Sequence, residues 1–150
     1  MSLPEFPISI AVPACRRFEQ LQVTLTRLQA CDPPPTEILV HLDGNDTALR
    51  ALVEGEFPNV RLLHSSVLIG PGGARNRLMR EARCSWVAHF DDDSFPADED
   101  FFARARKLIA RYPETAVFAA TILPVESADS LGLWLQANYF GCGHLMTRVS

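Results

Sequence analysis

Apolar and polar positions along this chain fall into short β-branched runs separated by longer stretches with helical spacing. Residues 8–12 form the first run, which Pro13 interrupts, and they predict a strand. From residue 18 to residue 30 the apolar side chains recur at intervals of three and four, as on one face of an amphipathic helix. Asp32 and the three prolines after it predict the end of this helix.

The alternation of strand-like and helix-like segments continues to about residue 121. Further strands are predicted at residues 37–42, 60–63, 86–90 and 116–121, with a less clear candidate at residues 139–146. Further helices are predicted from a cap at Asp46 or Thr47 to about Glu54, from a glycine-rich turn at residues 69–76 to about Ala82, and from a cap at Asp98 to Tyr112. Strands that alternate with helices favour an α/β fold with a parallel, helix-flanked sheet.

The composition fits one globular domain of 150 residues, with 47% hydrophobic and 21% charged residues. The formal net charge of −4 and the lack of a Lys/Arg block argue against nucleic acid as a partner. The four cysteines contain no Cys-x-x-Cys pair, so a structural zinc site is not expected. Neither a secretory signal pattern nor a membrane-spanning apolar stretch occurs, and we expect a cytoplasmic protein with free thiols.

Three adjacent carboxylates, Asp91, Asp92 and Asp93, directly follow the predicted strand at residues 86–90. Like charges in a row repel one another unless a cation or water meets them, and parallel α/β sheets bind ligands at the carboxyl ends of their strands. On an extended backbone Asp91 and Asp93 would point to one side and Asp92 to the other. The pattern predicts a site where two carboxylates share Mg²⁺ or Mn²⁺ with a diphosphate. The alternative is a solvated acidic turn, since residues 98–100 are also acidic.

Two other segments carry candidate binding residues. Asp43 follows the second predicted strand, where a carboxylate can accept hydrogen bonds from a nucleobase or a ribose; a plain Asp-Gly turn is the alternative. Within residues 70–76, Gly72 and Gly73 permit close backbone approach, and the helix start favours anions. Arg75 could reach a phosphate or the base. This segment matches neither the GxGxxG nor the GxxxxGK[ST] pattern, so a simple loop-to-helix connection is the alternative.

The remaining candidates point less directly to chemistry. Cys15 lies next to two arginines and could be a reactive thiol, but a loop thiol without a role is the favoured interpretation. His41 and His89 alternate within predicted strands, and we interpret them as core or rim residues rather than ligands.

Four segments, in this order, resemble the nucleotide-binding half of family 2 glycosyltransferases of the GT-A fold. They are Val-Pro-Ala-Cys-Arg-Arg at residues 12–17, Leu-Asp-Gly-Asn-Asp at residues 42–46, Gly-Gly-Ala-Arg-Asn at residues 72–76 and Phe-Asp-Asp-Asp at residues 90–93, the last matching the family's DXD metal motif. The spacing fits along residues 8–125. The resemblance implies a three-layer α/β sandwich with a mainly parallel central sheet, and a single nucleotide-sugar-binding domain over residues 1–150.

The resemblance also implies an activity. A metal-dependent glycosyltransferase of hexosyltransferase type would move a sugar from a nucleotide-diphospho-sugar, favoured as a UDP-sugar, to a hydroxyl of a glycan, lipid or small-molecule acceptor, with inversion. Asp91 and Asp93 would hold Mg²⁺ or Mn²⁺, which would neutralise charge on the leaving diphosphate. The residues implied in substrate binding are Pro13, Ala14, Arg17, Asp43, Arg75, Asp91 and Asp92, with Asp43 facing the base.

The chain departs from the family's pattern in three places. Cys15 replaces an aromatic residue that would stack on uracil, and Leu42 replaces a frequent first aspartate of the second segment. The acidic motif that supplies the family's catalytic base lies well beyond the DXD motif, and Glu126 and Asp129 come too early to match it. We therefore expect a fragment truncated at its C-terminus, with the base beyond Ser150.

Two other functions stay open at this point. A domain that keeps the fold and binds a nucleotide-sugar or a partner without catalysis would also lack the distant base. A haloacid-dehalogenase-like phosphatase would use Asp91 as its nucleophile. That motif normally lies on the first strand and needs a downstream lysine and acidic pair, whereas here it follows the fourth predicted strand and the only lysine is Lys107.

Overall fold

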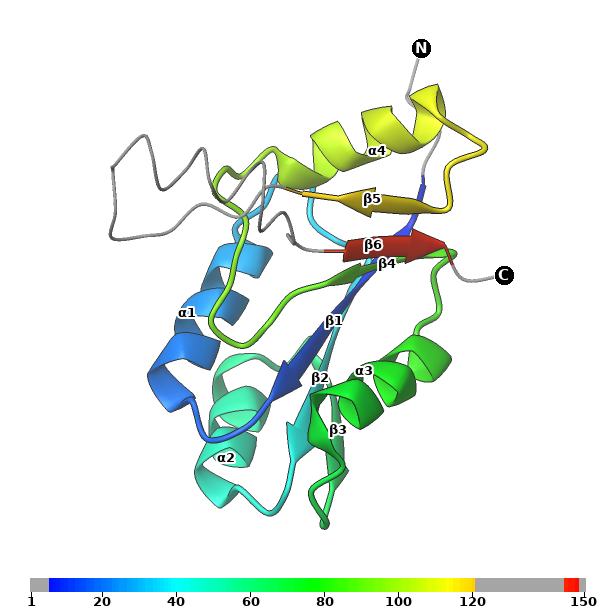
Figure 1. Cartoon of the computed structure of the whole chain (residues 1–150). Helices are drawn as coiled ribbons and strands as arrows, with labels where there is room; N and C mark the ends of the chain where they lie inside the picture. The colour runs from blue at the N-terminus through cyan, green and yellow to red at the C-terminus, as the bar shows by residue number, and fades with distance from the viewer. Residues whose placement is uncertain (1–5, 121–144, 149–150) are drawn as a thin grey trace, which may run out of the picture.

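The computed structural model describes residues 6–120 and 145–148, which form a six-stranded sheet with helices packed against it (Figure 1). The elements follow one another as β1 (Ile8–Ala14), α1 (Phe18–Gln29), β2 (Glu37–Asp43), α2 (Thr47–Glu56), β3 (Arg61–Ser65), α3 (Gly70–Glu81), β4 (Trp86–His89), α4 (Phe101–Arg111), β5 (Val117–Ala119) and β6 (Leu145–Arg148).

The sheet has the strand order β3-β2-β1-β4-β6-β5. Strands β1 to β4 run parallel to one another, and β6 lies antiparallel between β4 and β5. Strand β1 is central, and all seven of its residues are buried, as expected for a strand with helices on both faces. The predicted α/β fold with a mainly parallel, helix-flanked sheet is confirmed.

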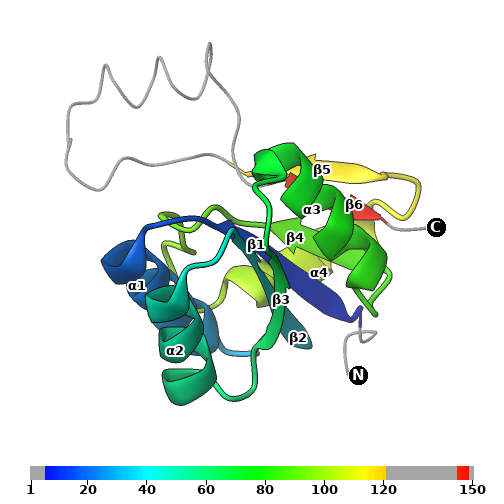
Figure 2. The same cartoon turned by 90° about the horizontal axis from the view of Figure 1, so that it is seen from below.

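Helices lie on both faces of the sheet (Figure 2), and the buried apolar side chains form one cluster on each face. Helices α1, α2 and α4 cover one face, where Ile10 of β1 joins Leu25 of α1 and Phe102 of α4 in the larger core cluster. Helix α3 covers the other face, where Leu78 packs in a smaller cluster with Leu39. Each fully buried side chain of this size contributes about 1.5–3 kcal/mol, so these contacts fix the layers.

Two helices begin at places that differ from the prediction. Helix α3 already starts at Gly70, so the glycine-rich segment forms its first turns, with Pro71 near the start where a missing N–H removes no helical hydrogen bond. Asp100, not Asp98, occupies the N-cap position of α4, without a side-chain cap bond. The predicted Asp98 cap is therefore wrong, and its carboxylate instead pairs with Arg104 at 3.0 Å.

The other element ends agree more closely with the sequence pattern. Asp46 caps α2 as predicted, because its Oδ1 accepts a hydrogen bond of 2.9 Å from Leu49 N. The candidate strand at residues 139–146 lies largely outside the described residues, and β6 starts only at Leu145. Within residues 6–120 and 145–148, no helix has the length and apolar character needed to span a bilayer.

Candidate functional site

The carboxyl ends of β1, β2 and β4 meet at one edge of the sheet, because these strands are parallel neighbours. Three loops leave this edge, namely the β1–α1 loop with Arg17, the β2–α2 turn after Asp43, and the β4–α4 loop with residues 91–93. We call this edge the rim. Each of these segments follows a strand predicted from the sequence, and the strand order of the folded sheet brings them to one edge.

The aspartate triplet forms a turn instead of continuing strand β4. Ser94 N donates to Asp91 O at 3.2 Å, and Asp91 N donates to Ser94 Oγ at 2.8 Å. The prediction of an extended backbone is therefore wrong, and the alternative of an acidic turn holds for these residues. The turn instead gives the three carboxylates different surroundings.

Asp92 is the buried member of the triplet, with 8% of the residue exposed. Its Oδ2 accepts a hydrogen bond from Cys15 N at 3.1 Å, and its backbone carbonyl accepts one from the buried Thr24 hydroxyl at 3.1 Å. Burial raises the pKa of Asp92, and the hydrogen bond from Cys15 N and the charge of Arg17 oppose this rise. Asp92 thus ties the β4–α4 loop to the β1–α1 loop.

Asp91 and Asp93 are the exposed members, and each faces an arginine. Arg75 of α3 pairs with Asp91. Arg17, at the start of α1, pairs with Asp93 and also lies 3.4 Å from Asp92 Oδ1. Side-chain exposures of 54% for Asp91 and 45% for Asp93 leave both carboxylates open to a ligand from solution.

Asp43 holds the start of α3 from the neighbouring strand β2. Its Oδ1 accepts hydrogen bonds from Ile69 N at 2.8 Å and from the Ser65 hydroxyl at 3.1 Å, and its Oδ2 accepts one from Gly70 N at 2.8 Å. Burial acts to raise the pKa of Asp43, but these hydrogen bonds outweigh it and lower the pKa below its usual range. Asp43 therefore positions the helix that carries Arg75, a role that the sequence did not reveal.

The glycines at the start of α3 serve different purposes. A Cβ atom at Gly73 would lie 3.1 Å from Ile69 Cβ, so this glycine lets the helix pack against the loop that precedes it. A Cβ atom at Gly72 would meet no other atom within 4 Å, so Gly72 faces open space. Of the two glycines predicted to permit close approach of a ligand, Gly72 has the room for it.

The β1–α1 loop takes an unusual backbone path between the strand and the helix. Arg16 has a φ of 60°, in the left-handed region that non-glycine residues seldom adopt. Before it, Pro13 and Ala14 are buried in β1, and Ala14 is only 2% exposed within the core cluster. Little of either residue is therefore exposed to a ligand, although the resemblance implies that both bind substrate.

Two buried histidines lie on the face of the sheet that α3 covers. Neither ring nitrogen of His41 has a hydrogen-bond partner among the described residues, and the residue is fully buried. Burial lowers the pKa of His41, and the charge of Arg77 lowers it further. Burial likewise lowers the pKa of His89, aided by Arg75. The interpretation of both as core or rim residues is confirmed.

With this geometry in place, the chain can be compared with known proteins. The profile described as "Glycosyl transferase family 2" matches residues 9–133. The chain belongs to glycosyl transferase family 2. No curated protein matches it.

Solved glycosyltransferases share the fold of this family 2 chain. TarS 1–349 of S. aureus superposes with a TM-score of 0.70 at 21% identity, over 82% of this chain and 37% of that protein. The mannosyltransferase PcManGT of Pyrobaculum calidifontis, solved with GDP-Man and Mn²⁺, superposes with a TM-score of 0.76 at 16% identity, over 94% of this chain and 44% of that protein. TarS 1–349 was also solved with UDP-GlcNAc. The chain thus spans less than half the length of these proteins.

The rim of this family 2 chain suits a divalent ion that is coordinated partly by protein carboxylates and partly by a bound substrate. No group of three or more His, Cys, Asp or Glu side chains in the described ranges lies close enough to hold an ion alone. Mg²⁺ does not require such a cage, because it keeps several waters and uses one or two carboxylates together with substrate phosphates. Asp91 and Asp93 offer two exposed carboxylates, so the donor set fits an ion of this kind.

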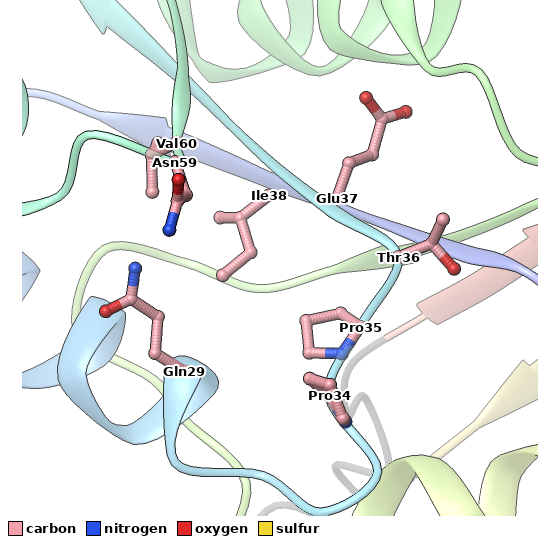
Figure 3. Close-up of a pocket in the computed structure, with 8 residues that line it drawn as sticks. All are labelled: Gln29, Pro34, Pro35, Thr36, Glu37, Ile38, Asn59 and Val60. Carbon is pink, nitrogen blue, oxygen red and sulfur yellow. The ribbon is translucent and has the colours of Figure 1, made fainter.

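A separate pocket lies at the opposite edge of the sheet and has no part in the rim (Figure 3). It has a volume of about 390 Å³ and is lined by Gln29, Pro34, Pro35, Thr36, Glu37, Ile38, Asn59 and Val60. The amides of Gln29 and Asn59 face each other, whereas Glu37 points away from them. The Glu37 carboxylate already accepts hydrogen bonds from Ser9 and Arg61, so we assign no ligand to this pocket.

Proposed function

We propose that this chain is the donor-binding part of a metal-dependent glycosyltransferase of hexosyltransferase type, which transfers a sugar from a UDP-sugar to an acceptor hydroxyl. One observation carries the proposal: three carboxylates and two arginines gather at the carboxyl edge of the parallel sheet, beside the start of α3. Membership of family 2 supports it, as do fold neighbours solved with UDP, UDP-GlcNAc, and GDP-Man with Mn²⁺.

The charge balance at the rim gives a physical reason for an ion in this proposal. When Asp43 and the three aspartates of the triplet are ionised, they outnumber Arg17 and Arg75 by two charges, so the rim repels a diphosphate. A Mg²⁺ or Mn²⁺ held by Asp91 and Asp93 would neutralise this local charge. When bound, the ion supplies Lewis-acid stabilisation of the leaving nucleoside diphosphate.

The protein's own side chains bind and orient the donor in this proposal. Arg17 and Arg75 each offer a planar guanidinium, which suits two-point contact with phosphate oxygens. The first turns of α3 favour negative charge, and Gly72 leaves room beside them. The nucleoside would lie along the β1–α1 loop and the turn after Asp43, with Asp92 fixing the distance between the loops on either side.

The acceptor side of the reaction belongs to a larger protein in this proposal. The base that removes the proton of the acceptor hydroxyl would lie beyond Ser150, so that the hydroxyl attacks the anomeric carbon opposite the leaving group and inverts it. The acceptor would be a glycan, a lipid or a small molecule. A domain that binds the donor without transfer is the second candidate, because the chain spans 37–44% of its solved neighbours.

Calorimetric titration of UDP tests the donor site directly. We expect UDP to bind in the presence of Mn²⁺ and at least tenfold more weakly with EDTA, and Asp93→Asn to weaken Mn²⁺-dependent binding by a similar factor, because a neutral amide is a poor ligand for a hard cation. Asp98→Asn is the matched control, since Asp98 is an exposed aspartate that also pairs with an arginine but lies away from the rim.

Two results would contradict the proposal. Equal UDP binding with and without Mn²⁺ would show that the ion is not part of the UDP site. UDP binding that persists in Asp93→Asn but is lost in Asp98→Asn would show that the site does not lie at the rim. Release of free sugar from UDP-sugars by this chain, abolished by Asp93→Asn, would favour catalysis over the binding-only candidate.

A further inference from the structure

The arginines at the rim occupy the carboxylates that the proposed function assigns to the metal ion. Arg17 pairs with Asp93 and approaches Asp92, and Arg75 pairs with Asp91. We propose that Arg17 is a tethered counter-cation of the triplet: it sits on Asp93 until a divalent ion and a diphosphate arrive together, and then moves to the diphosphate. This inference rests on the proposed function and adds a regulation of metal binding to it.

The backbone of Arg17 is fixed, but its side chain is free to change partners. Arg17 O accepts a hydrogen bond of 3.0 Å from Leu21 N in the first turn of α1, and two residues earlier Cys15 N donates to Asp92 Oδ2. The Arg17 side chain is 51% exposed and that of Asp93 is 45% exposed. Ion pairs at such exposure are weak, so a divalent ion can displace the guanidinium at a moderate cost.

Electrostatics then couples the metal to the nucleotide. A divalent ion on Asp93 repels a guanidinium held on the same carboxylate, so an ion that binds alone leaves Arg17 with Asp92, at 3.4 Å, as its remaining carboxylate partner. A diphosphate replaces the partner that Arg17 has lost, because its oxygens accept two hydrogen bonds from one guanidinium. Each ligand therefore strengthens the binding of the other by the same factor.

Arg17 could instead have either of two simpler roles, and each predicts a different result. If Arg17 only contacts phosphate, its removal leaves the affinity for the ion alone unchanged. If Arg17 only keeps the triplet ordered, its removal weakens the binding of the ion. Only a counter-cation predicts that the ion alone binds more tightly while the nucleotide binds less tightly.

The experiment measures Mn²⁺ binding to the full chain by electron paramagnetic resonance, with and without saturating UDP, and UDP binding by calorimetry in Mn²⁺. For Arg17→Gln we expect the Kd of Mn²⁺ alone to fall about twofold to fivefold, the effect of losing one exposed ion pair. We expect the Kd of UDP in Mn²⁺ to rise, so that the ratio of the Mn²⁺ Kd values without and with UDP decreases. Arg17→Lys, which keeps the charge, should restore much of the wild-type coupling.

Arg104→Gln is the matched control, because Arg104, like Arg17, pairs with two aspartates, Asp98 at 3.0 Å and Asp100 at 2.7 Å. It should leave both Mn²⁺ values at wild-type levels, and circular dichroism confirms that each variant is folded.

The outcomes separate this inference from the proposed function. If the wild-type protein binds Mn²⁺ with UDP, and Arg17→Gln leaves the affinity for Mn²⁺ alone unchanged or weakens it, the counter-cation role is overturned and the metal site stands. If neither protein binds Mn²⁺ at any UDP concentration, both are overturned. If Arg104→Gln tightens Mn²⁺ binding as much as Arg17→Gln, the effect is one of net charge and the inference is also overturned.

Discussion

Two of the aspartates at the rim, Asp43 and Asp92, accept hydrogen bonds from the protein's own backbone, whereas Asp91 and Asp93 are exposed and pair with arginines. Asp43 accepts from two backbone amides at the start of α3, and Asp92 accepts from Cys15 N in the β1–α1 loop. The same residue type thus serves two purposes, and burial distinguishes them, because Asp92 is 8% exposed and Asp91 is open to solvent.

His41 makes the stability of the folded protein depend on pH. The unfolded chain binds a proton on this residue near pH 6.5, while burial keeps the folded side chain neutral to lower pH. Below about pH 6.5 the unfolded state therefore binds more protons at His41 than the folded state does, so the free energy of unfolding decreases as the pH falls. For His41→Leu we expect about 1 kcal/mol more stability at pH 7.5, because two ring nitrogens without a partner among the described residues leave the core. We also expect a smaller loss of stability on going to pH 5.5.

Urea denaturation of both proteins at the two pH values measures this. His64→Leu is the control, because His64 is exposed on the adjacent strand β3. A His41→Leu variant that loses as much stability between pH 7.5 and pH 5.5 as the wild type would contradict the role of His41.

Arg16 holds a strained backbone conformation that glycine adopts freely. A left-handed conformation costs an L-residue about 1–2 kcal/mol, and glycine removes this cost while adding about 0.5–1 kcal/mol of chain entropy to the unfolded state. We expect Arg16→Gly to be neutral or stabilising by up to about 1 kcal/mol, and Arg16→Val to be destabilising. Thermal unfolding checks both, and an Arg16→Gly variant less stable than Arg16→Val would show that the loop does not have this conformation in solution.

At the scale of elements, helix α3 connects Asp43 at the end of β2 with Asp91 in the triplet. Asp43 binds its first amides, Leu78 packs on the sheet, and Arg75 between them pairs with Asp91. The position of Arg75 therefore depends on a hydrogen-bonded carboxylate on another strand. A change at Asp43 should reach the ligand site through the helix even where it does not touch the ligand.

Asp43→Ala and Asp46→Ala form a matched pair, since each removes a carboxylate that caps a helix. Asp46 caps α2 within its own loop, whereas Asp43 binds the start of α3 from β2. We expect each variant to lose about 1–2 kcal/mol of stability in urea. Only Asp43→Ala should also weaken UDP binding in Mn²⁺ several-fold, and equal UDP affinities of the two variants would contradict the link between Asp43 and the rim.

The sequence predicted these elements because their signals are local. The β-branched run at residues 8–12 and the helical spacing of residues 18–30 record which face of each element is buried, and the structure confirms both. The bond from Cys15 N to Asp92 joins residues 77 positions apart, and no periodicity reports such a partner. The turn at residues 91–93 was predicted only as the alternative to an extended segment, because the strand pattern does not show where pairing with a neighbour ends.

At the scale of the whole molecule, the parallel sheet separates two edges with different chemistry. The carboxyl edge gathers the triplet, the two arginines and the start of α3, while the opposite edge holds the pocket around Ile38 and Asn59. Family membership is read from the chain as a whole, and the order of the four segments in the sequence predicted it before any contact was known. The hydrogen-bond and ion-pair partners of the triplet could be identified only in the folded structure.

Paramagnetic broadening by Mn²⁺ in the presence of UDP, read from the amide signals of the labelled protein, tests the central claim most directly. A bound Mn²⁺ broadens only the signals near it, so we expect the amides of Cys15, Gly72 and Asp93 to vanish at low Mn²⁺ while those of Ile38 and Asn59 at the opposite edge persist. Broadening centred on Ile38 and Asn59, or spread evenly over the protein, would contradict a metal and diphosphate site at the rim.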